Sequence, residues 1–276
     1  MSNILIIARK EIQEGLRNRW VLATTLLLGA LSLSLTLLGS APTGTVGVHP
    51  LDVTIVSLSS LTIFLVPLIA LLISHDAIVG EMERGTLLLL LSYPVARWQV
   101  VLGKFIGHLA ILGFATLVGY GAAALTLVVG AAEIDAGSEL AFIAMMCSSV
   151  LLGAVFIAIG YLISSLVRDR GTAAGIAVGV WLLLVLIYDM TVLGALVMDQ
   201  GRIVSGPVLT VLLMLNPTDV YRMFNLAGFA KASQFSGMAG LAGSAGAGPF
   251  TLLATLVAWT LVPLTLAAAR FSRREL

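Results

Sequence analysis

Residues 20–39 read WVLATTLLLGALSLSLTLLG, and this run of 20 residues contains nine leucines and no charged side chain. A helix needs about 20 consecutive apolar residues to cross the roughly 30 Å hydrocarbon core of a bilayer. The run therefore predicts a membrane-spanning helix, and five further stretches have the same character. The six predicted spans are residues 20–39, 53–74, 100–130, 140–167, 172–187 and 249–269.

The composition of the chain is that of a membrane protein. Of its 276 residues, 59% are hydrophobic and 11% are charged, and the mean hydropathy is +1.07. Soluble domains carry about 25% charged residues, and disordered chains combine low hydrophobicity with high net charge, so neither class fits. A net charge of +1 provides no basic surface for nucleic acid. The single cysteine, Cys147, allows neither an internal disulfide nor a four-cysteine zinc site.

Positive charges gather on one side of the predicted spans. The loops 40–52 and 131–139 contain no Lys or Arg, whereas 12 of the 15 basic residues lie in or beside the other loops and at the two ends. By the positive-inside rule, both termini are expected in the cytoplasm. The first span is expected to be retained, because Ala41-Pro42 after it makes a poor signal-peptidase site.

The N-terminal segment, residues 1–19, has the pattern of an amphipathic helix. Apolar residues recur at helical spacing on one face (Ile4, Ala8, Ile12, Leu16), and charged residues occupy the other. Such a helix lies in the membrane plane, at the level of the lipid headgroups. The alternative is a basic leader that only sets the topology.

The longest predicted cytoplasmic loop, residues 75–99, contains five consecutive leucines at 87–91. Five apolar residues are too few to cross a bilayer. They predict a short helix that buries an apolar face against another protein or in the membrane interface, and Pro94 is expected to end it. The alternative is an ordinary linker between two spans.

The segment 188–248 is predicted to be external or re-entrant, because its apolar run at 208–215 is too short to span. Asp189, at the outer end of the fifth predicted span, is expected to meet water. The chain is thus divided into an interfacial helix (1–19), five spans with the cytoplasmic loop (20–187), the external segment (188–248), and the last span with its basic tail (249–276).

Two sets of glycines predict close helix packing. Gly171, Gly175 and Gly179 share one helix face, as do Gly103 and Gly107, and such faces let another backbone approach. The spacing leaves open whether the partner belongs to the same subunit or to a second one.

Two ionisable residues share a face of the third span, one helical turn apart. Lys104 and His108 both lie near its cytoplasmic edge. Lys104 is expected to extend its ammonium to the headgroup region, and His108 is a weaker candidate for a gate or a ligand.

Sequence motifs for catalysis or confident metal binding are missing. Sulfur ligands suit Cu(I), and Met145, Met146 and Cys147 are adjacent. Consecutive helix positions face different directions, however, so these three are only weak candidates and core packing is favoured. No G-x-x-x-x-G-K-[ST] loop is present to bind ATP, and no H-E-x-x-H or G-x-S-x-G motif offers catalytic residues.

The loop carries a family resemblance. Glu81-x-Glu83-x-Gly85-Thr86, the leucines, Pro94-Val95-x-Arg97 and then Gly103-Lys104 resemble the type-two ABC transporter permeases (the ABC-2 family), in which E-x-x-x-G-T-L leads into P-[VS]-x-R and G-K. The resemblance extends over the whole chain. Its opening Met-x-x-Ile-x-x-Ile-Ala-Arg-Lys-Glu and its Gly-rich stretch before the last span are similar to the branch that matures the copper centres of bacterial nitrous oxide reductase.

The resemblance implies an all-α permease of the bacterial inner membrane that is not itself an enzyme. It implies a homodimer with two copies of a separate cytoplasmic ATPase, which binds ATP and Mg, and a periplasmic accessory protein. The process implied is assembly of the reductase's copper centres, with copper, a sulfur species or no cargo translocated. The residues implied to form the ATPase-facing coupling element are Glu81, Glu83, Arg84, Gly85, Thr86, Leu87, Leu88, Leu91, Pro94 and Arg97.

Two alternatives remain open at this point. One is a type-two exporter permease for an unrelated drug or lipid-like cargo. The other is an ATPase-independent carrier or a membrane scaffold. Charge pairs within the membrane would support a carrier, and the predicted spans show none.

Overall fold

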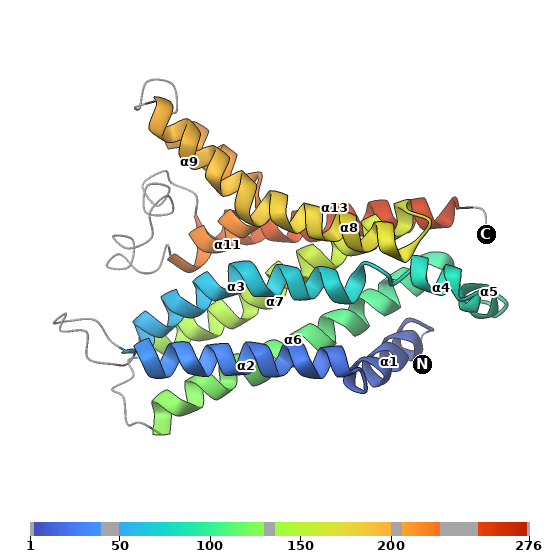
Figure 1. Cartoon of the computed structure of the whole chain (residues 1–276), viewed down its shortest axis with the longest axis horizontal. Coiled ribbons are helices and arrows are strands. Elements are labelled where there is room, and N and C mark those ends of the chain that lie inside the picture. Colours follow the sequence, from blue (N-terminus) through green and yellow to red (C-terminus); the bar gives the residue numbers. More distant parts are fainter. Residues whose placement is uncertain (1–2, 40–49, 130–135, 200–205, 227–247, 275–276) are drawn as a thin grey trace.

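The computed structural model describes residues 3–39, 50–129, 136–199, 206–226 and 248–274, and every regular element in them is a helix. The long helices lie side by side along the long axis of the molecule (Figure 1). The prediction of an all-α protein is confirmed. The long helices are α2 (Arg19–Gly39), α3 (Pro50–Ser74), α6 (Arg97–Val129), α7 (Ala136–Leu166), α8 (Arg170–Leu182), α9 (Tyr188–Asp199) and α13 (Pro249–Ser272).

Five helices in the described residues are long and apolar enough to cross a membrane. The number rises to six if α2 and the preceding helix α1 (Asn3–Leu16), which are bent by 68° relative to each other, form one broken span. The structure thus supports five or six spans where the sequence predicts six.

Helix α7 is the centre of the bundle, packed against α3, α6 and α13. Its side chains Val155, Phe156 and Tyr161 are fully buried. Gly153 and Gly160 allow this density, because a Cβ atom at either position would collide with Leu112 or Ser74 respectively. The core therefore runs along α7, and the other long helices are arranged around it.

The fifth predicted span is longer than the sequence indicated. The chain stays helical from Arg170 to Asp199, through a π-helical turn at Leu183–Ile187, so the predicted end at Ile187 is 12 residues too early. Two short helices follow, α10 (Gly206–Met214) and α11 (Pro217–Leu226). Helix α10 coincides with the predicted short apolar run, and the Gly-rich tract lies largely in 227–247, outside the described residues.

The two predicted glycine seams differ in the structure. A Cβ at Gly103 would lie 2.8 Å from Ile7 Cβ, and one at Gly107 would lie 2.5 Å from Glu11 Cβ, so these glycines receive α1. At Gly175 and Gly179 a Cβ would meet nothing within 4 Å, and at Gly171 it would meet only Asp169. The first seam is therefore internal to the chain, whereas the second has an open face.

Candidate functional site

The loop that carries the family resemblance folds into two short helices at the end of the bundle where both termini lie (Figure 1). Helix α4 spans Val79–Glu83 and helix α5 spans Thr86–Leu91. Between them, Gly85 has φ +70° and ψ 0°, a left-handed conformation that glycine adopts without a steric penalty. Gly85 thus sets the angle at which α5 leaves α4.

Helix α4 is tied to the ends of two long helices. Ser164 Oγ in α7 accepts hydrogen bonds from the backbone N–H groups of Ile78 and Val79, both at 3.0 Å. Glu83 accepts from the backbone N–H of Arg170 at 2.8 Å and from its Nε at 2.7 Å. The carboxylate therefore joins α4 to the first residue of α8, where the orphan N–H groups of a helix favour a negative charge.

Helix α5 has one buried side and one exposed side. Leu87 is 2% exposed and belongs to the core, whereas Leu88 and Leu89 are 61% and 69% exposed. Tyr93 and Trp98, which follow, are exposed as well. We call these four exposed side chains, Leu88, Leu89, Tyr93 and Trp98, the α5 patch. Of the other implied coupling residues, Arg84, Thr86 and Pro94 are exposed and Leu91 is half-buried.

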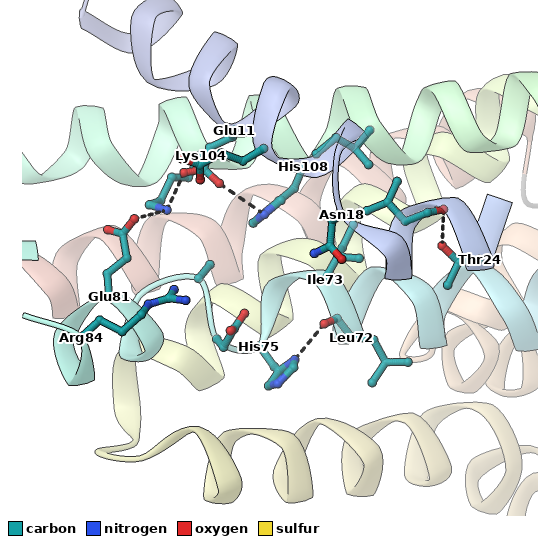
Figure 2. Close-up of a pocket in the computed structure, with 16 residues that line it drawn as sticks. Glu11, Asn18, Thr24, Leu72, Ile73, His75, Glu81, Arg84, Lys104 and His108 are labelled. Atoms are coloured by element: carbon teal, nitrogen blue, oxygen red, sulfur yellow. Dashed lines mark hydrogen bonds and ion pairs between the residues drawn. The ribbon is translucent and has the colours of Figure 1, made fainter. Parts of the chain in front are cut away.

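Lys104 does not extend to the headgroups as expected. Its side chain is buried, and its Nζ lies 2.7 Å from Glu11 Oε1 and 2.8 Å from Glu81 Oε1 (Figure 2). A buried ammonium requires charged or hydrogen-bonding partners, and the two carboxylates provide them within the bundle. Glu81 consequently points into the bundle rather than outward.

His108 extends the same cluster toward α7. Its Nδ1 lies 2.8 Å from Tyr161 Oη, and its Nε2 lies 3.7 Å from Glu11 Oε2. We call Glu11, Glu81, Lys104 and His108 the Lys104 cluster. Its members come from α1, α4 and α6, so the cluster joins the N-terminal helix, the loop and a long helix at one point.

The role of Glu11 was missed from the sequence. The signal was present, because Glu11 follows Ile7 by four residues and Ala8 by three, which places all three on one helix face. These are the buried residues of α1. Glu11 was overlooked because a carboxylate on an apolar face is unfavourable unless a cation meets it.

Arg97 acts within the chain rather than at its surface. Its Nη1 donates to the backbone carbonyls of Phe271, Ser272 and Arg274 at 3.1, 3.2 and 2.6 Å. Arg274 in turn donates to the carbonyls of Ser165 and Val167 at the end of α7. These contacts satisfy carbonyl groups that have no partner within a helix. The start of α6 is thereby fixed to the ends of α13 and α7.

A second charged cluster lies toward the other end of the bundle. Arg222 in α11 donates to Asp219 at 2.6 Å and to Asp189 in α9 at 2.7 Å, and Asn216 donates to Asp219 at 3.0 Å. We call these four residues the outer cluster. Asp189 is therefore ion-paired, not simply hydrated as expected. Two carboxylates share one guanidinium, and burial above all raises the pKa of Asp219 to about 7.

The outer cluster fits beside the π-helical turn. Asn216 Nδ2 donates to the carbonyl of Leu184 at 2.8 Å, and Thr218 Oγ1 donates to the same oxygen at 3.4 Å. A π-helical turn frees backbone carbonyls from the regular i to i−4 pattern. The turn thus provides an acceptor that holds α11 against the continuous helix Arg170–Asp199, which we call the fifth long helix.

The sulfur residues do not converge. Met145 is buried, Met146 is half-buried and Cys147 is exposed, so they occupy different sides of α7. Among the described residues, no group of three His, Cys, Asp or Glu side chains is placed to hold a metal ion.

Comparison of the sequence with known proteins shows the family of this chain. Residues 5–276 match the family described as ABC-2 family transporter protein. The chain belongs to the ABC-2 family. It is 46% identical over 275 residues to the probable ABC transporter permease protein NosY of Stutzerimonas stutzeri, covering 99% of both chains. It is 47% identical over 277 residues to the protein of the same description from Pseudomonas aeruginosa, covering 100% of both.

The ABC-2 assignment agrees with the family resemblance of the loop. The chain is a multi-pass membrane permease, and an ABC transporter permease works with an ATPase subunit. The loop 75–99 thus carries both the exposed leucines of the α5 patch, Leu88 and Leu89, and one carboxylate of the buried Lys104 cluster, that of Glu81.

Proposed function

We propose that this permease couples ATP hydrolysis by a separate ATPase to its own conformational change, and that the α5 patch is the docking surface for that ATPase. The observation that carries the proposal is the exposure of Leu88 and Leu89 on α5. The helix that precedes it, α4, is fixed to the bundle by the polar contacts of Glu83 and Glu81. Burying a leucine contributes about 1.5–3 kcal/mol, so two leucines provide a substantial part of a docking energy.

The anchoring contacts supply a route for the motion. Helix α4 reaches α8 through Glu83, α7 through Ser164, and α1 and α6 through Glu81 and Lys104. A displacement of α5 by the ATPase is therefore delivered to four helices at once. The ATPase supplies the differential interaction with two states that any such change requires.

We infer that the permease is a homodimer that uses the open face of α8. A Cβ at Gly175 or Gly179 would have no neighbour within 4 Å among the residues that the structure describes, and Ile176 and Val178 beside them are 42% and 41% exposed. Small residues at such positions allow close backbone contact between membrane helices. Two copies would then bind two ATPase subunits.

The process that we propose is the assembly of the copper centres of nitrous oxide reductase, together with a periplasmic accessory protein. Its support is the resemblance of the chain's opening and of its Gly-rich stretch before the last span to that branch of permeases, and the near-full-length identity to two NosY permeases. We place the protein in a bacterial inner membrane with both termini cytoplasmic, because 12 of its 15 basic residues fall on that side.

The test uses a double variant, Leu88→Asp with Leu89→Asp, expressed with the partner ATPase. The control is Gln13→Asp, which adds the same kind of charge at an exposed position of α1. We expect the double variant to lose co-purification of the ATPase and the control to retain it. An intact, fully coupled complex in the double variant would contradict the docking assignment.

Copper assembly has a separate readout in the same cells. Nitrous oxide reductase isolated from the double variant should contain less copper than reductase from the control. Normal copper content despite a lost ATPase would assign the permease to an unrelated cargo. If no ATPase co-purifies with the unaltered permease and the reductase keeps its normal copper content when the permease is deleted, an ATPase-independent carrier or a scaffold would be favoured.

A further inference from the structure

A cavity of about 550 Å³ lies beside the Lys104 cluster, between α1, the end of α3, α4 and α6. In Figure 2, Glu11, Lys104 and His108 lie on one side and His75 and Arg84 on the other, and Glu81 reaches Lys104, to which a dashed line joins it. The charged part of its wall has more acidic than basic residues, with four carboxylates against one guanidinium and one ammonium. These residues are Glu11, Glu14, Asp76, Glu81, Arg84 and Lys104.

Glu81 carries an acceptor atom that the described chain leaves unused. Its side chain is 9% exposed, and its Oε1 is occupied by Lys104. Its Oε2 has no hydrogen-bond partner among the residues that the structure describes. A buried polar group without a partner costs about 1–3 kcal/mol. A hydrogen-bond donor in the cavity would remove that cost.

Arg84 offers a cation three residues after Glu81, directly beyond the end of α4. Its side chain is exposed and lines the same cavity, and its guanidinium makes no hydrogen bond or ion pair with the described part of the chain. A guanidinium in such a position favours a phosphate, which it can bind through two N–H groups. Glu81 and Arg84 together match a ligand that contains both an ammonium and a phosphate.

The remaining wall of the cavity combines the polar side chains of Asn18, Thr24, His75 and His108 with apolar ones. Val21, Ile73 and Ile111 line it, together with Leu72, which is 43% exposed on α3. Helix α3 belongs to the helices long and apolar enough to cross a membrane. The cavity therefore combines charged side chains with apolar ones, and one of the apolar ones, Leu72, is exposed on a helix long and apolar enough to cross a membrane, so the lining suits an amphiphile.

We propose that this cavity binds the headgroup of a phospholipid with a primary ammonium, of which phosphatidylethanolamine is the simplest case. The ammonium donates to Glu81, the phosphate accepts from Arg84, and the acyl chains leave past Leu72. A quaternary ammonium cannot donate a hydrogen bond, and a purely anionic headgroup would face four carboxylates. The lipid is a resident ligand at the junction of α1 and α4, not a transported cargo.

The experiment measures lipids retained by the full-length protein. The chain is purified, depleted of lipid, and exposed to equimolar phosphatidylethanolamine, phosphatidylcholine and phosphatidylglycerol before native mass spectrometry. We expect retention of phosphatidylethanolamine to exceed that of the other two by about tenfold, the ratio that corresponds to one charge-assisted hydrogen bond. Soluble phosphoethanolamine is added in a parallel sample to test a headgroup without chains.

The variants are Arg84→Gln and Glu81→Gln, with Arg273→Gln as the matched control. Arg273 is exposed at the same end of the bundle and lies outside the cavity. We expect each cavity variant to reduce the preference for phosphatidylethanolamine by about tenfold, and the control to keep it. Arg84→Gln removes no internal contact of its guanidinium, so it decides the matter if Glu81→Gln impairs folding.

Three results would overturn the proposal. One is equal retention of the three lipids by the unaltered protein. Another is an unchanged preference in Arg84→Gln. The third is displacement of the lipid by phosphoethanolamine at equal concentration, which would assign the cavity to a soluble headgroup compound instead of a membrane lipid.

Discussion

Lys104 in α6 and Glu81 in α4 form a buried ion pair, with Nζ and Oε1 2.8 Å apart. The pair joins a long membrane helix to the base of the helix that carries the α5 patch. The same ammonium holds Glu11 of α1 at 2.7 Å. Lys104 is thus the nearest cation to two carboxylates from two other elements, whereas Lys10 contacts the same two carboxylates from 3.6 and 3.7 Å, so removal of Lys104 affects both.

Replacing Lys104 with Met should destabilise the protein by about 3–5 kcal/mol, because two buried carboxylates lose their nearest cation, the one that is buried with them. The free energy of unfolding in detergent micelles measures this. Lys10→Met is the control, since Lys10 contacts Glu11, Glu14 and Glu81 from a side chain that is 51% exposed. Exposed pairs contribute about 1 kcal/mol or less. An equal decrease in the free energy of unfolding in the two variants would show that the buried ion pairs stabilise the protein no more than the exposed ones.

Gly107→Ala should displace α1 from α6. The new Cβ would lie 2.5 Å from Glu11 Cβ and 3.1 Å from the carbonyl oxygen of Ala8, and overpacking of this kind costs about 1–3 kcal/mol. Hydrogen exchange of the α1 amides should rise. Gly121→Ala is a matched control in the same helix, because its Cβ would meet nothing within 4 Å. Equal hydrogen-exchange protection of the α1 amides in the two variants would contradict the packing of α1 against Gly107.

Arg222→Gln should separate α11 from the fifth long helix. It leaves Asp189 and Asp219 without the guanidinium that both contact, and breaking a buried pair costs about 3 kcal/mol or more. Cysteine cross-linking between α9 and α11 should fall in the variant. Thr191→Val, which removes only a hydrogen bond from α9 to the carbonyl of Ile187 in the π-helical turn, provides the comparison, and similar cross-linking in both variants would contradict the role of Arg222.

The outer cluster should also make stability depend on pH. Burial raises the pKa of Asp219 from its ordinary value of 3.8 to about 7, so the folded protein binds a proton that the unfolded chain has released. Its contribution to stability therefore falls as the pH rises from 3.8 to about 7, and is constant above that. Asp219→Asn should lack this decline. Parallel unfolding curves of the two proteins from pH 4 to pH 8 would refute the shift.

The long helices could be predicted from local composition. A segment such as α2 or α7 is recognised because about 20 apolar residues in succession suit the bilayer whatever surrounds them. Helix α5 could be predicted too, since its leucine run is too short to span and Pro94 follows it, whereas α4 was not predicted. These features depend on residues that are consecutive in the sequence, so they can be predicted without knowledge of the tertiary structure.

The partners of the charged residues depend on contacts between distant segments. Lys104 meets Glu11 and Glu81, and Asp189 meets Arg222, across 93, 23 and 33 positions of sequence. No charge pair was visible within the spans, because Glu11, Glu81 and Arg222 lie in short helices outside them. Amphipathic spacing marked α1 as a helix but did not show that its buried face carries a carboxylate.

Spans and loop helices were therefore decided by the polarity of consecutive residues, which acts over one helix length. The early end assigned at Ile187 and the expected exposure of Lys104 were corrected by the folded chain, and packing gave Asp189 an ion pair that the sequence does not predict. A buried polar group is stable inside the bundle only where another segment supplies its counter-charge. The glycines show the same division: their spacing predicts close approach, but only the folded chain shows that Gly107 receives α1 and Gly175 stays open.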